Sequence, residues 1–71
     1  MKGMIKMFII KRMGQNKDLT YNGSESNAIE ILEDEAVKYG FADLIKEGKY
    51  LYTAIRNEGL ISTKLIKHNA I

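Results

Sequence analysis

Apolar residues dominate the first stretch of this 71-residue chain and predict a hairpin there. Residues 4–13 are rich in Ile, Met and Phe and lack the signals that start a helix, which is typical of a strand. Residues 14–18 are turn-like, and residues 19–21 form a second, short candidate strand. The pattern therefore predicts two antiparallel strands that end before Asn22-Gly23.

The middle of the chain has the spacing of a helix. Apolar or small residues recur three and four positions apart at Ile29, Leu32, Ala36, Gly40 and Leu44, and the stripe is widened by Val37, Phe41 and Ile45. Residues 24–27 offer several N-caps, and Asn27 with Glu30 fits a capping box. Gly48 is a suitable residue to end the helix, with Lys46 in its last turn, and Gly40 can divide the segment into two shorter helices.

Residues 49–56 and 60–66 are both enriched in aromatic and β-branched residues, with Asn57-Glu58-Gly59 as a three-residue loop between them. This reading gives an α+β fold, a small antiparallel sheet in the order ββαββ packed by one long or broken helix. In the alternative, residues 50–57 form a second helix with Gly59 as its cap, and the order is ββαα. Either way, residues 1–71 are expected to form one small binding domain.

Alternation along the strands predicts which side chains meet the helix. The inward set comprises Ile5, Met7, Ile9, Leu51, Ile55, Ile61 and Leu65. The outward set carries aromatic rings among cations: Lys6, Phe8, Arg12, Tyr50, Tyr52, Arg56 and Lys64. Rings stack on unpaired bases while Lys and Arg neutralise phosphates, so this set predicts a nucleic-acid site that prefers single strands to duplex. The competing interpretation is that Phe8, Ile10, Tyr50 and Tyr52 form a homodimer interface.

Charge is segregated along the chain and suggests a second partner. Residues 1–17 hold five basic residues and no acid, whereas residues 18–47 hold eight acids against two lysines. Glu30, Glu33 and Asp34 are neighbours on the predicted helix, and Glu47 extends the negative stretch. The alternative function is therefore a protein-binding inhibitor or adaptor that engages a basic protein, as phage anti-defence proteins of similar charge pattern do. The competing interpretation is that these acidic residues form a solvated outer helix face that keeps a small domain soluble.

The composition argues against catalysis. The chain has no Cys, and its single histidine is His68, so disulfides and a zinc ligand set are ruled out and no catalytic triad is recognisable. We expect no enzyme activity, no metal and no cofactor. No run approaches the roughly 18 apolar residues of a membrane span. The expected protein is a cytoplasmic binding or regulatory protein that works as a homodimer or within a complex.

Overall fold

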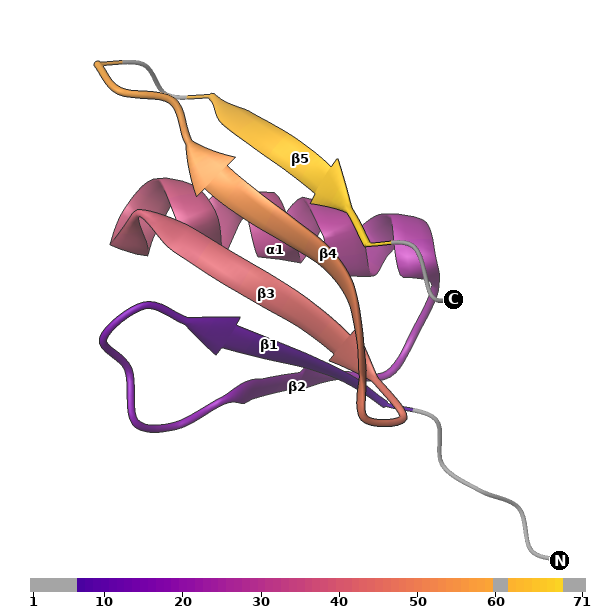
Figure 1. Ribbon diagram of the computed structural model, residues 1–71. Coiled ribbons are helices and arrows are strands. Elements are labelled where there is room, and N and C mark those ends of the chain that lie inside the picture. Colours follow the sequence, from indigo (N-terminus) through magenta and orange to yellow (C-terminus); the bar gives the residue numbers. More distant parts are fainter. Residues whose placement is uncertain (1–6, 60–61, 69–71) are drawn as a thin grey trace, which may run out of the picture.

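The computed structural model describes residues 7–59 and 62–68 and shows one helix packed on a five-stranded antiparallel sheet (Figure 1). The elements are β1 (Phe8–Arg12), β2 (Leu19–Tyr21), α1 (Glu25–Tyr39), β3 (Phe41–Lys46), β4 (Lys49–Arg56) and β5 (Thr63–Lys67). The strands lie in the order β2-β1-β3-β4-β5, and each neighbouring pair is antiparallel. The predicted α+β class is therefore confirmed.

The two C-terminal segments form the predicted hairpin, so the alternative of a second helix over residues 50–57 is wrong. β4 and β5 pair from Tyr52 opposite Lys67 to Arg56 opposite Thr63. Gly59 has the expected left-handed backbone, with φ of 75°. The connection is longer than three residues, and its ends are joined by a hydrogen bond from the Asn57 N–H to the Ser62 carbonyl (2.8 Å). The predicted inward positions Ile5 and Ile61 lie outside the described residues.

The helix ends earlier than predicted, and it begins at the first of the predicted N-cap candidates. Ser24 is the N-cap, and its hydroxyl accepts a hydrogen bond from the Asn27 N–H (3.2 Å), so the capping box at Asn27 is wrong. Gly40 ends α1 with φ of 106°, and its N–H binds the Ala36 carbonyl. Glu47 and Gly48, expected at the helix end, form the two-residue turn between β3 and β4 with φ of 53° and 77°. Both residues being left-handed is the geometry that a tight hairpin needs.

The core lies between α1 and the sheet. Ala28, Leu32 and Ala36 face it from the helix at spacings of four residues. The strands contribute five buried side chains: Phe8, Ile10, Ala42, Leu44 and Ala54. Four of these eight core residues are alanines, and their small side chains let the helix backbone approach the sheet closely. Among the described residues, α1 is too short and too polar to cross a membrane.

The face assignment of the first strand is corrected by this core. Phe8 and Ile10 are almost fully buried under α1, whereas Met7 is exposed and Ile9 lies on the opposite face. The prediction had these two faces reversed. The prediction failed because residues 7–10 are apolar at both odd and even positions, so alternation does not tell which face of the strand is covered.

Gly40 gives a direct test of where the helix ends. Its φ of 106° with ψ of −49° is a backbone region that residues with a Cβ rarely adopt. We expect Gly40→Ala to lower the free energy of unfolding by about 1–3 kcal/mol. Gly14→Ala is the matched control for a left-handed turn glycine outside the helix–strand junction. Urea denaturation followed by circular dichroism measures both; an unchanged midpoint for Gly40→Ala would contradict this helix end.

Candidate functional site

The sheet face opposite α1, called the open face below, is uncovered in the described residues, and it faces the viewer in Figure 1. Strand pairing places the same-face residues next to one another. Its apolar members are Ile9, Phe41, Ile45, Tyr50, Ile55 and Ile66, of which Ile45 is buried. Its polar members include Lys11, Asp43, Thr53, Lys64 and His68. Of the rings, Phe41 is 39% and Tyr50 is 48% exposed. The open face is thus an apolar, aromatic surface edged by lysines.

A β-bulge decides which tyrosine belongs to this face. Leu44 pairs with Tyr52 and Ile45 pairs with Tyr50, so Leu51 is an extra residue in β4. Leu51 and Tyr52 both pack against the core beneath α1. Tyr50 turns to the open face, where its ring meets the His68 ring edge-on at a centroid distance of 6.4 Å. The bulge therefore separates two tyrosines that simple alternation places together.

A short chain of polar contacts crosses the open face. The Thr53 hydroxyl donates to Asp43 Oδ1 (2.6 Å) and lies 2.7 Å from His68 Nε2. Because a hydroxyl has one proton, and here it goes to the carboxylate, His68 Nε2 donates to the Thr53 oxygen. The histidine is then not placed to remove the Thr53 proton, which is the step that a nucleophilic triad requires. These contacts fix the His68 ring beside Tyr50.

Two predicted site residues on β1 lie on the helix side of the sheet. Phe8 is buried in the core, and Lys46 Nζ lies 4.6 Å from the centre of its ring. Arg12 is enclosed between β1 and α1, where its guanidinium lies 5.3 Å from the centre of the Tyr39 ring. Neither side chain reaches the open face. Lys6, the third predicted residue of this segment, lies outside the described residues.

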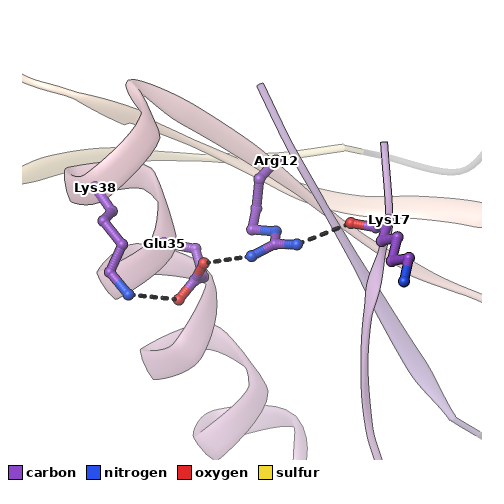
Figure 2. A network of polar contacts seen from close by, with 4 residues as sticks. All are labelled: Arg12, Lys17, Glu35 and Lys38. Atoms are coloured by element: carbon purple, nitrogen blue, oxygen red, sulfur yellow. Dashed lines mark hydrogen bonds and ion pairs between the residues drawn. The ribbon is translucent and has the colours of Figure 1, made fainter. Parts of the chain in front are cut away.

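Arg12 joins three parts of the fold, as Figure 2 shows. Nη1 forms an ion pair with Glu35 Oε1 (3.2 Å), and Nη2 donates to the carbonyl of Lys17 (2.8 Å). The other carboxylate oxygen of Glu35 lies 3.7 Å from the ammonium of Lys38. The Nε of Arg12 is buried and has no acceptor among the described residues. The arrangement links β1, the β1–β2 loop and the second half of α1.

Tyr52 and Arg56 also turn toward α1. The Tyr52 hydroxyl donates to Glu25 Oε2 (3.2 Å), and Arg56 Nη1 donates to the Val37 carbonyl (2.9 Å). Desolvation, and then the hydrogen bond and negative charge of Glu25, raise the pKa of Tyr52. Of the seven residues predicted to share one basic and aromatic surface, the structure places Tyr50 and Lys64 on the open face, near opposite ends of β4.

The predicted acidic surface is divided as well. Glu30 and Asp34 are exposed on the outer side of α1. Glu33 is half-buried and accepts a hydrogen bond from the Thr63 hydroxyl (3.3 Å), so it lies at the side of α1 nearest β5. Glu47 is in the β3–β4 turn and does not continue the helix. The outward acidic surface of α1 therefore consists of Glu30 and Asp34, with Glu33 at its side.

Sequence reasoning missed Lys11 and Phe41 as open-face residues. Lys11 pairs with Asp43, and Phe41 pairs with Ile55, which is itself exposed although it was predicted to point inward. A signal for Phe41 was present in the sequence. Gly40 can end a helix, and the mostly apolar residues 41–46 that follow have the length of a strand.

Comparison with protein-family models, with curated proteins and with solved structures found no match for this chain. Within the described residues there is no pocket and no group of three or more acidic, His or Cys side chains placed to hold a metal ion. The site is therefore described by its own geometry, as an exposed sheet surface on a small α+β protein.

Proposed function

We propose that this protein is a non-catalytic cytoplasmic binding protein whose open face binds single-stranded nucleic acid. The observation that supports this proposal most is the placement of two exposed rings, Phe41 and Tyr50, on one sheet face with Lys11 and Lys64. Base stacking on aromatic rings is tolerant of sequence, and lysines neutralise phosphates without reading bases. The proposed ligand is therefore an unpaired strand of no fixed sequence.

The spacing of the rings suits a strand that runs along β3. Phe41 belongs to β3, and Tyr50 lies opposite Ile45, four residues further along that strand. Four residues of β-strand span about 13 Å, which leaves room for bases to stack on each ring separately. Asp43 lies between them, and its carboxylate accepts the hydrogen bond from Thr53. With two lysines on this face among the described residues, we expect binding to be weak and only moderately sensitive to salt.

Anisotropy titration of a labelled oligothymidine with the full chain tests the proposal. We expect binding at low salt, and a loss of about 1–3 kcal/mol, or roughly 5- to 150-fold in affinity, for Phe41→Ala and for Tyr50→Ala. Lys64→Gln should lower the slope of log affinity against log salt by about 0.7. The matched control is Tyr52→Phe, which alters a tyrosine on the helix side. Absence of binding at low salt, or unchanged affinity in both ring variants, would refute the proposal.

A second candidate function is that of an inhibitor or adaptor that engages a basic protein through α1. It is supported by Glu30 and Asp34, which are exposed and have no ion-pair partner among the described residues. The variant Glu30→Gln with Asp34→Asn separates the two proposals. If the open face is the site, this variant binds the oligonucleotide as well as the unchanged chain does. If α1 is the site, a basic partner loses affinity for this variant and keeps it for Tyr50→Ala.

A further inference from the structure

The free edge of β5 is the most exposed part of the sheet. β5 is the last strand in the order, and in the described residues it has a neighbour on one side only. Leu65 and Ile66 point to opposite faces, and each is 37% exposed. Natural sheets usually cover such an edge or keep it short and charged, because its unpaired backbone groups are ready to pair with another strand.

The backbone direction of β5 can be read from two hydrogen bonds. The His68 N–H binds the Leu51 carbonyl (2.9 Å), and the Ser62 carbonyl accepts from the Asn57 N–H (2.8 Å), so both residues face β4. In an antiparallel ladder the facing direction alternates, and residues 64 and 66 therefore also face β4. The N–H and C=O groups of Thr63, Leu65 and Lys67 point outward, away from the sheet.

We propose that β5 pairs with β5 of a second copy, which makes a two-fold homodimer with one continuous ten-stranded sheet. In the antiparallel register centred on Leu65, Leu65 lies opposite its own copy and Thr63 lies opposite Lys67. The outward N–H and C=O groups of all three residues then form hydrogen bonds with the second copy. Lys64 falls opposite Ile66, so no two lysines face each other, as they would if Lys64 met Lys67.

Charge complementarity identifies the occupant as a second copy. Thr63, Leu65 and Lys67 share the helix side of the sheet, and Thr63 is hydrogen-bonded to Glu33 on α1. Residues directly opposite in an antiparallel pair have Cβ atoms about 5 Å apart. Lys67 of the second copy, opposite Thr63, thus reaches the carboxylate of Glu33. The two-fold axis produces this lysine–glutamate contact twice, and the Leu65 side chains meet at the axis.

Sedimentation equilibrium of the full chain across the micromolar range, without any ligand, tests the dimer. We expect a dimer for the unchanged chain and a monomer for Leu65→Pro. Proline at this position removes an outward N–H and leaves the β4–β5 ladder intact, so circular dichroism should show a folded monomer. Ile55→Asp, on the open face, is the matched control and should remain dimeric. A monomeric unchanged chain, or a Leu65→Pro variant that stays dimeric, would overturn the proposal.

A charge exchange tests the register independently of proline. Glu33→Lys and Lys67→Glu should each weaken dimerisation by roughly tenfold or more, because each places like charges together at two equivalent positions. The double variant should recover most of that loss. Lys64→Glu, on the other face, should not be rescued by Glu33→Lys. Failure of the double variant to recover would exclude this register. The mass is measured without nucleic acid, so the result stands apart from the function proposed above.

Discussion

Replacing Ile10 with aspartate should leave the chain unfolded. Ile10 is fully buried in the core under α1, and no polar or charged residue is buried among the residues that the structure describes. An unpaired buried charge costs several kcal/mol, to which the lost apolar contacts add about 2–5 kcal/mol. A domain of this size is stable by only about 4–10 kcal/mol, so the change exceeds or consumes the whole stability.

Amide proton spectra and far-ultraviolet circular dichroism of purified Ile10→Asp at low temperature measure this effect. The control is Ile55→Asp, which makes the same chemical change on the open face at a side chain that is 41% exposed. We expect the control to keep dispersed amide resonances. A folded Ile10→Asp variant would mean that β1 turns its other face to the helix, as simple alternation suggested.

The fold class followed from the sequence because its signals were local. The turn residues, the three-and-four spacing of residues 28–36 and the β-branched segments after residue 49 each specify an element without reference to the rest of the chain. The end of the helix did not follow. Leu44 and Ile45 continue the helical spacing past Gly40, and the same two residues also fit a buried strand. Whether this segment is helix or strand is decided by the pairing of β3 with both β1 and β4. No local sequence pattern contains that information.

The candidate site was harder to predict, because faces depend on pairing. One extra residue at Leu51 is enough to place Tyr50 and Tyr52 on opposite sides of the sheet. Arg12 and Arg56 look like solvent-exposed cations in the sequence, yet both are bound to α1. The guanidinium of each finds an acceptor on the helix, although Arg56 stays exposed while Arg12 is enclosed. A basic residue in a strand therefore does not show by itself that its face is open to a ligand.

Among the polar contacts drawn in Figure 2, the ion pair of Arg12 with Glu35 should contribute most to stability. Both side chains are 12% exposed, so water compensates poorly for the loss of either partner. We expect Arg12→Ala to lower the free energy of unfolding by about 2–4 kcal/mol, since it leaves the Glu35 carboxylate and the Lys17 carbonyl without this donor. Urea denaturation monitored by circular dichroism gives the value.

Lys38 provides the comparison, because it approaches the same carboxylate from solvent. Its side chain is 66% exposed and the separation is 3.7 Å, so Lys38→Ala should cost less than about 1 kcal/mol. The double variant Arg12→Met with Glu35→Met should be more stable than Arg12→Ala, because it removes both charges and fills the space with apolar side chains of similar length. Equal losses for Arg12→Ala and Lys38→Ala would show that burial does not distinguish these cations. In that case the contacts between β1, the loop and α1 would rest on packing rather than on the enclosed guanidinium.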